Sequence, residues 1–288
     1  MIFEPPQEKI PVLLAPGTET SMMIYSHLPQ ENSPVFVCLP ALGISSKHYA
    51  HLARLLAAEF NAVAITTDWR GLGTSSVRAK RGVDFGYKEL LEDIEHQLRI
   101  VKTKYPQSPV YLIGHSLGGQ LACLYGAWGK TVISGIILVA ACSIYYKGWP
   151  GLEGYKILAF TQTARLLSKV LGYFPGKKVG FGGTESRTVI EDWSHTARTG
   201  RYELKNTDFN FEQSLTKVKL PVLAVQIFGD RLAPSLAIEN LCAKLKSAAV
   251  AKVVLGNPTD ARKLNHFNWV KHPENLLKII KNWMSEKH

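Results

Sequence analysis

Short runs of apolar and β-branched residues alternate along this chain with longer stretches in which apolar residues recur at helical spacing. The strand-like runs are residues 35–39, 62–66, 110–113, 133–140, 222–227 and 251–255. Helical spacing is clearest over residues 48–60 and 87–101. Near-continuous apolar strands separated by amphipathic helices are typical of a parallel sheet that is covered on both faces. The pattern predicts an α/β fold with a mostly parallel sheet flanked by helices.

The segment between residues 140 and 222 interrupts this alternation. It is rich in glycine and aromatic residues, and helical patterns occur only at 155–170 and, more weakly, at 188–199. Such a segment is too long for an ordinary connection. We expect an inserted lid over residues 142–213, above the strand ends where open α/β sheets bind ligands. Residues 1–141 and 214–288 would then form the core, and the alternative is an irregular surface excursion.

Composition and charge narrow the class of protein. The chain has 288 residues, of which 46% are hydrophobic, and this excludes a disordered chain. Its net charge is +11, and residues 214–288 hold 12 basic but only 5 acidic residues. This excess is either a solvated basic face or a means of attracting anionic partners. The basic clusters at 78–81 and 177–178 lie outside any recognition motif, so we expect no nucleic-acid binding.

The sequence has none of the usual targeting or metal-binding motifs. The longest apolar run, residues 135–142, is far shorter than the ~20 residues of a spanning helix. Residues 1–6 do not have the pattern of a secretory signal. The four cysteines lack CxxC spacing, and HExxH is absent. We therefore expect a cytoplasmic protein with reduced thiols, no transmembrane segment, no metal and no cofactor.

The strongest chemical signal is the stretch Gly114-His115-Ser116-Leu117-Gly118, which lies between a predicted strand and a predicted helix. A G-x-S-x-G sequence in this setting is typical of a nucleophile held on a sharp turn. Glycines at both ends prevent collisions with neighbouring backbone. Ser116 is therefore the predicted nucleophile. The alternative is a purely structural role, in which the serine only caps the helix.

A serine nucleophile needs a base, and the base needs an acid to orient it. His266 follows the last predicted strand and is the predicted base, whereas His272 and His195 are better explained as surface or lid residues. Asp230 follows the strand at 222–227 and is the predicted acid. Asp260 is its rival, in a segment equally typical of a polar turn.

The remaining parts of the site are backbone donors and pocket walls. We expect the N–H groups of Leu42 and Leu117 to bind the oxyanion of a reaction intermediate. The loop that carries Leu42 is also compatible with simple helix capping by Ser45 or Ser46. Aromatic residues of the predicted lid are candidates for an acyl or aryl pocket, although packing explains many of them equally well: Tyr145, Tyr146, Trp149, Tyr155, Phe160, Tyr173, Phe174, Phe181 and Trp193.

Together these motifs resemble those of the α/β-hydrolase superfamily over nearly the whole chain. The matching segments are residues 40–46, 68–75, 114–119, 229–234 and 266–269. The resemblance is greatest to bacterial hydrolases of the serine-aminopeptidase and monoglyceride-lipase branch, and it implies hydrolysis of an ester, lipid or peptide. Most members have His-Gly-x-Gly where this chain has Pro40-Ala41-Leu42-Gly43, so a histidine that braces the loop is missing here.

The sequence therefore predicts a serine hydrolase that cleaves a small-molecule acyl ester or lipid-like substrate with water. One alternative is an aminopeptidase, which would need an acidic cluster to recognise a free amine. The other is a member of the fold that binds a ligand without catalysis. The predicted triad Ser116, Asp230 and His266 is complete in the sequence, which favours an enzyme.

Overall fold

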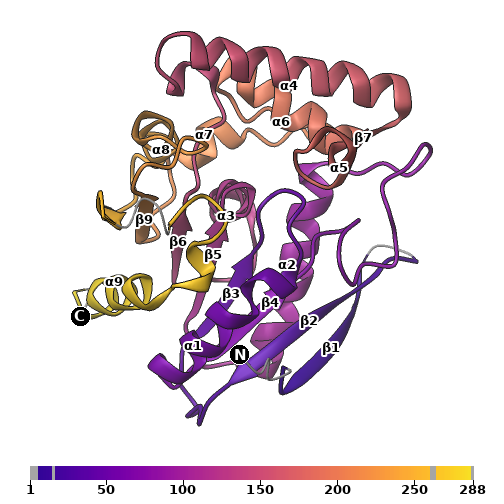
Figure 1. The fold of residues 1–288 in the computed structure, drawn as a ribbon. Helices are drawn as coiled ribbons and strands as arrows, with labels where there is room; N and C mark the ends of the chain where they lie inside the picture. The colour runs from indigo at the N-terminus through magenta and orange to yellow at the C-terminus, as the bar shows by residue number, and fades with distance from the viewer. Residues whose placement is uncertain (1–5, 15–16, 260–263, 287–288) are drawn as a thin grey trace.

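An eight-stranded sheet forms the centre of the computed structural model, which describes residues 6–14, 17–259 and 264–286 (Figure 1). The strand order is β1-β2-β4-β3-β5-β6-β9-β10. All neighbouring pairs are parallel except β1–β2 and β2–β4. The strands are β1 (Glu8–Leu13), β2 (Glu19–Ser26), β3 (Val35–Leu39), β4 (Val63–Thr67), β5 (Val110–His115), β6 (Gly135–Val139), β9 (Val222–Ile227) and β10 (Val250–Leu255). The mostly parallel sheet predicted from the sequence is confirmed.

The six predicted strands correspond to β3, β4, β5, β6, β9 and β10, with ends that shift by at most two residues. The two N-terminal strands were not predicted. β1 lies at the edge of the sheet, is mostly exposed and contains Pro11. Proline is tolerated in an edge strand because a solvent-facing N–H is not needed for pairing. The weak apolar pattern of β1 therefore reflects its edge position.

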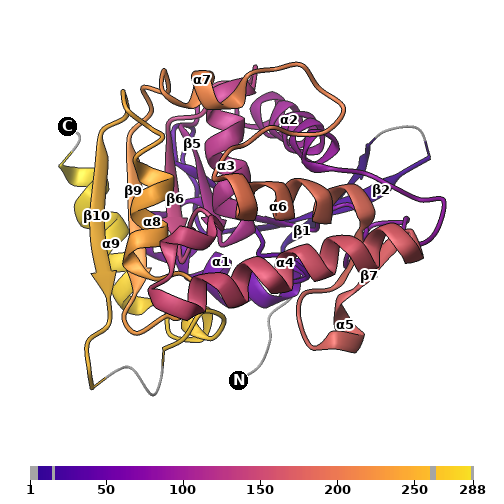
Figure 2. The same ribbon diagram turned by 90° about the horizontal axis from the view of Figure 1, so that it is seen from above.

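Helices cover both faces of the sheet (Figure 2). α1 (Ala50–Phe60) contacts α9 (Glu274–Ser285) on one face, and α2 (Tyr87–Lys104) contacts α3 (Leu117–Trp128) on the other. α8 (Ser235–Cys242) packs against β9. Pro234 and Pro273 immediately precede α8 and α9, respectively. The helical patterns at 48–60 and 87–101 thus correspond to α1 and α2.

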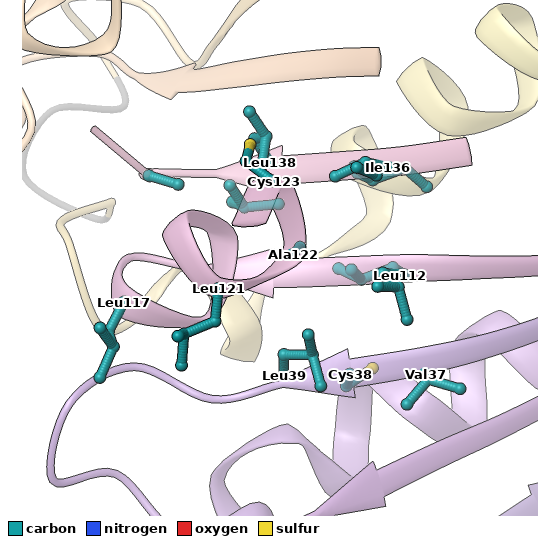
Figure 3. Packing of buried hydrophobic residues seen from close by; sticks show 14 of the residues in the cluster. Val37, Cys38, Leu39, Leu112, Leu117, Leu121, Ala122, Cys123, Ile136 and Leu138 are labelled. Carbon is teal, nitrogen blue, oxygen red and sulfur yellow. The ribbon is translucent and has the colours of Figure 1, made fainter. Parts of the chain in front are cut away.

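The sheet and α3 share a densely packed core (Figure 3). Leu112 of β5 is paired with Val37 of β3 on one side and with Ile136 of β6 on the other. Residues 117–125 of α3 are all buried, and apolar side chains such as Leu121 occur around most of the helix. A helix that is hydrophobic on all sides belongs in the interior. The core therefore fixes the position of α3, whose N-terminus carries the predicted nucleophile.

The chain between β6 and β9 forms further helices above the carboxyl ends of the strands (Figures 1 and 2). Its elements are η2 (Tyr146–Gly148), α4 (Gly151–Leu171), β7 (Tyr173–Pro175), α5 (Gly176–Val179), β8 (Thr184–Ser186), α6 (Arg187–Thr199) and α7 (Phe211–Leu215). α4 and α6 pack against each other and correspond to the two predicted helices. The hairpin β7–β8 was not predicted, and the boundaries of the lid stay a prediction. No helix in the described part of the chain is both long enough and apolar enough to cross a bilayer.

Shortening Leu112 tests the core. We expect Leu112→Ala to reduce the free energy of unfolding by about 2–5 kcal/mol, because it opens a cavity beneath α3. The matched control is Val132→Ala at a residue that is 76% exposed, which we expect to change stability by less than about 0.5 kcal/mol. Urea unfolding of both variants measures the difference. Equal effects would contradict the packing described for Leu112.

Candidate active site

Ser116 lies on a sharp turn between β5 and α3. Its φ and ψ angles are 52° and −115°, a backbone conformation that non-glycine residues rarely adopt. Residues kept in such conformations cluster at functional sites, where the surrounding structure compensates for the strain. The turn places the Ser116 side chain in a cavity at the carboxyl end of the sheet.

The two glycines of the turn are required by close backbone contacts. A Cβ atom at Gly118 would lie 2.1 Å from the carbonyl oxygen of Leu39, and one at Gly114 would lie 2.4 Å from the Cα of Gly119. Both distances are far below van der Waals contact. Glycine at these two positions therefore lets α3 begin directly against the ends of β3 and β5.

His266 and Asp230 form a buried pair, although they are 36 residues apart in the chain. His266 Nδ1 donates a hydrogen bond of 2.7 Å to Asp230 Oδ2, and the two side chains are only 8% and 1% exposed. The other carboxylate oxygen accepts a hydrogen bond of 2.9 Å from the N–H of Leu232. Because the hydrogen is on Nδ1, the lone pair of the imidazole is on Nε2. His266 lines the same cavity as Ser116.

The loop that carries His266 is held by several further contacts. His48 Nε2 donates to the carbonyl oxygen of Phe267 at 2.7 Å. The side chains of Asn265 and Asn268 accept hydrogen bonds from each other's backbone N–H at 2.9 and 2.6 Å. These contacts fix the imidazole relative to α1 and the sheet.

The rival residues lie elsewhere. His272 is exposed at the end of a 3-10 helix (η3, Trp269–Lys271), and His195 of α6 bonds to Glu203 at 3.0 Å. Neither lines the cavity around Ser116. Asp260 lies outside the described residues. No three His, Cys, Asp or Glu side chains in the described ranges group together in a way that could hold a metal ion.

The two predicted oxyanion donors, Leu42 and Leu117, also line this cavity. Leu117 is the first residue of α3, where the backbone N–H groups have no partner within the helix. Within the described ranges, neither backbone N–H donates to another protein atom. Both are therefore available to an anion that forms beside Ser116.

Two aromatic residues brace the loop in which the histidine of His-Gly-x-Gly is missing. Trp69 Nε1 donates to the carbonyl oxygen of Pro40 at 2.8 Å, and the N–H of Ala41 donates to the hydroxyl of Tyr49 at 2.9 Å. The Tyr49 hydroxyl also forms a 2.7 Å hydrogen bond with Nδ1 of His115, next to Ser116 in the sequence. Burial lowers the pKa of His115 well below its usual value and keeps this ring neutral. The loop is thus tied to the turn at Ser116 without the family's histidine.

The cavity around Ser116 is small, with a volume of about 80 Å³, and mostly apolar. Its walls come from α3, α4 and α6 and from the loops that follow β3, β6, α5, β9 and β10. The lining residues are Ala41, Leu42, Ser116, Leu117, Gln120, Cys142, Ile144, Trp149, Ile157, Phe160, Thr161, Phe181, Gly182, Trp193, Leu232, His266 and Phe267. Of the nine aromatic candidates, only Trp149, Phe160, Phe181 and Trp193 line it. Tyr155 is instead 61% exposed on α4. Drug-sized ligands occupy pockets of roughly 300–1,000 Å³, so this conformation suits a small group.

The hairpin β7–β8 packs directly on the loop of Leu42. Gly43 has a φ of +74°, and a Cβ atom there would lie 2.1 Å from the backbone nitrogen of Gly183. The N–H of Gly183 donates to the buried carboxyl group of Glu185 at 2.9 Å. Burial raises the pKa of Glu185 to about 7, although the nearby Lys177 acts in the opposite direction. A titratable group therefore lies at the contact between the hairpin and the loop.

Comparison with known proteins identifies the family. Residues 30–256, more than three quarters of the chain, match the family described as serine aminopeptidase, S33. The chain belongs to the serine aminopeptidase S33 family. Its fold is the α/β-hydrolase fold, which confirms the class and the branch expected from the sequence motifs. The name of the family does not by itself assign an activity to this member.

Relatives of this S33-family member include monoglyceride lipases. The chain is 25% identical over 201 residues to the enzyme of Rattus norvegicus and 26% identical over 207 residues to that of Homo sapiens. These alignments cover 65% and 67% of this chain, but only 62% and 64% of the relatives, less than two thirds of their length. A soluble variant of the Saccharomyces cerevisiae monoglyceride lipase, solved with a substrate analog, has a similar fold with a TM-score of 0.70. At 18% identity over 98% of this chain and 95% of that one, the likeness concerns the fold alone.

Several features of the site were not identified from the sequence. They are the bonds of Tyr49 and His115, the contact of Gly43 with Gly183, and the inward-facing Gln120. His115 and Gly43 stand in the motifs themselves, but their partners come from distant segments. Only the partners reveal what these residues do.

Replacing Glu185 tests whether the raised pKa of its buried carboxyl group makes the stability of the protein depend on pH. Between its usual pKa of 4.5 and about 7, the folded protein keeps a proton that the unfolded chain releases. The contribution of Glu185 to the free energy of unfolding therefore falls as the pH rises through this window. Glu185→Gln keeps an oxygen for Gly183 but does not titrate, so we expect it to gain stability relative to the wild type from pH 5 to pH 8. Urea unfolding at both pH values measures this gain, and a difference that stays constant would contradict it.

Proposed function

We propose that this protein is a serine hydrolase that cleaves esters with a small, uncharged acyl group through an acyl-enzyme. The observation that carries the proposal is the buried His266–Asp230 pair, whose histidine lines the same apolar cavity as Ser116 on its strained turn. The likeness to monoglyceride lipases supports an ester as the substrate. The proposed co-substrate is water.

In the proposed mechanism, the Ser116 hydroxyl attacks the ester carbonyl carbon while His266 Nε2 takes its proton. Asp230 holds the Nδ1–H tautomer and stabilises the imidazolium that forms. The N–H groups of Leu42 and Leu117 stabilise the oxyanion, and each such donor is typically worth about 10²–10³-fold in rate. His266 then returns the proton to the leaving alcohol. Water attacks the acyl-enzyme in the second half of the reaction by the same route.

The charge around the cavity favours an ester over a peptide with a free amino terminus. No aspartate or glutamate occurs among the described residues that line it. Several acidic residues between β6 and β9 are engaged elsewhere, as in the pairs of Glu153 with Lys156 and of Glu212 with Lys244. Asp192 accepts hydrogen bonds from the N–H groups of Tyr87 and Lys205. A cationic amine would therefore lack a counter-charge in the site.

The test is the hydrolysis of short p-nitrophenyl esters. We expect Ser116→Ala to lower kcat/KM by at least about 10³-fold, because it removes the nucleophile, while the melting temperature stays nearly unchanged. His266→Ala should cause a comparable loss, and the matched histidine control is His272→Ala, which we expect to retain activity. A fluorophosphonate probe should label the wild type at Ser116.

Three results would contradict the proposal. Full activity of Ser116→Ala would exclude the proposed nucleophile, and a wild-type protein that neither reacts with the probe nor hydrolyses esters would favour a binding role. Faster cleavage of aminoacyl p-nitroanilides than of esters would instead favour an aminopeptidase.

A further inference from the structure

Gln120 is a buried polar side chain in the apolar cavity beside Ser116. It belongs to the first turns of α3 and is only 4% exposed. Burying an amide that lacks hydrogen-bond partners destabilises the folded protein. The bonds of Gln120 therefore indicate what this residue does.

One end of the Gln120 amide is fixed by Tyr202. The Tyr202 hydroxyl donates to Gln120 Oε1 at 3.2 Å. Tyr202 is 1% exposed, its N–H donates to Glu212 at 2.8 Å, and Lys244 lies 5.5 Å from the centre of its ring. A buried hydroxyl needs an acceptor, and the amide oxygen is the acceptor that the described residues supply. This bond therefore sets the orientation of the amide.

The other end, the NH₂ group, has no acceptor in the described part of the chain. Gln120 lines the cavity. Its Nε2 atom is not one of the fully buried side-chain atoms that lack a hydrogen-bond partner. Two other polar wall groups are already engaged: Thr161 donates to the carbonyl oxygen of Leu158 at 2.9 Å, and the Cys142 thiol donates to that of Leu232 at 3.7 Å. The Gln120 amide is thus a free donor that opens into the cavity.

The position of Gln120 relative to Ser116 determines where the hydrogen-bond acceptor of a bound substrate would lie. The backbone N–H of Gln120 donates to the carbonyl oxygen of Ser116 at 3.3 Å, so the two residues are one helical turn apart. Both side chains line the same small cavity, whose volume is about 80 Å³. The described walls contain no lysine, arginine or carboxylate, so nothing there would balance a charged ligand. The matching group is a neutral oxygen a few bonds from the ester carbonyl.

We propose that Gln120 is a specificity-determining residue, which selects esters whose buried end carries a neutral oxygen acceptor such as an ether, hydroxyl or ketone. This inference rests on the proposed serine hydrolase function and narrows its substrate class. An ester with a plain alkyl group at this point leaves the amide NH₂ unpaired in an apolar cavity. Sites that hydrogen-bond a substrate discriminate strongly against analogues without the bonding group.

The experiment compares esters that differ by one atom. On the acyl side, p-nitrophenyl 3-methoxypropanoate is compared with p-nitrophenyl pentanoate. On the alcohol side, 2-methoxyethyl acetate is compared with butyl acetate. The measured quantity is the ratio of kcat/KM for the ether to that for the alkyl ester. Comparing variant with wild type cancels the intrinsic reactivities of the esters.

We expect Gln120→Met, which keeps the length of the side chain but removes the donor, to lower this ratio about tenfold for one of the two pairs. Gln120→Leu provides the same test if the methionine variant is unstable. The matched control is Thr161→Val in the same cavity, whose hydroxyl is already bonded within α4, and it should leave both ratios unchanged. Tyr202→Phe should lower the same ratio by a smaller factor, because it removes the hydrogen bond that orients the Gln120 amide but keeps the amide itself.

The outcomes separate the two proposals. Ratios unchanged in both Gln120 variants, with hydrolysis that depends on Ser116, would overturn the role of Gln120 alone. An equal fall of the ratio in Thr161→Val would also overturn it, since any change in the cavity would then suffice. Hydrolysis of none of the four esters by the wild type would overturn the serine hydrolase function, and this inference with it.

Discussion

The close backbone approach around Ser116 is the constraint on which the rest of this structure depends. α3 begins so near the ends of β3 and β5 that neither Gly114 nor Gly118 has room for a side chain. The strained conformation of Ser116 persists because the buried first turns of α3 are packed into the core. The serine hydroxyl, the N–H of Leu117 and the amide of Gln120 are therefore carried by one rigid element.

The other parts of the site are brought to this turn by contacts among loops. The imidazole of His115 packs against His266 with ring centroids 5.1 Å apart and is hydrogen-bonded to Tyr49, whose hydroxyl also holds Ala41. One neutral, buried ring thus contacts the loop of the proposed base directly and is linked to the loop of a proposed oxyanion donor through the Tyr49 hydroxyl. These contacts support the loop of Leu42 without the histidine of the His-Gly-x-Gly pattern. Trp69 completes the support by holding the carbonyl of Pro40.

Local patterns were sufficient for much of the fold and for the candidate site. The central strands read clearly because apolar residues fill both of their faces. The exposed edge strand β1 and the neighbouring β2, which begins with the polar residues Glu19, Thr20 and Ser21, gave little signal. Ser116, His266 and Asp230 were predicted because their places after strands are fixed by the order of the fold. The short hairpin β7–β8 escaped prediction, since three-residue strands with one pairing partner carry almost no periodicity. The selection of four among nine aromatic candidates as cavity walls depended on how α4, α6 and the loops of the segment between β6 and β9 fold over the sheet.

The sequence by itself determined the α/β class, the order of the sheet's buried strands along the chain and the residue types available for chemistry. These properties follow from local spacing, which does not change with distant contacts. Only the tertiary structure decided that Tyr202 would orient Gln120, that Gly43 would meet Gly183, and that the cavity would be small and uncharged. Each of these contacts joins segments far apart in the chain, and packing in three dimensions selects them. The chemistry was thus encoded locally, whereas the shape that selects a substrate was set by the whole fold.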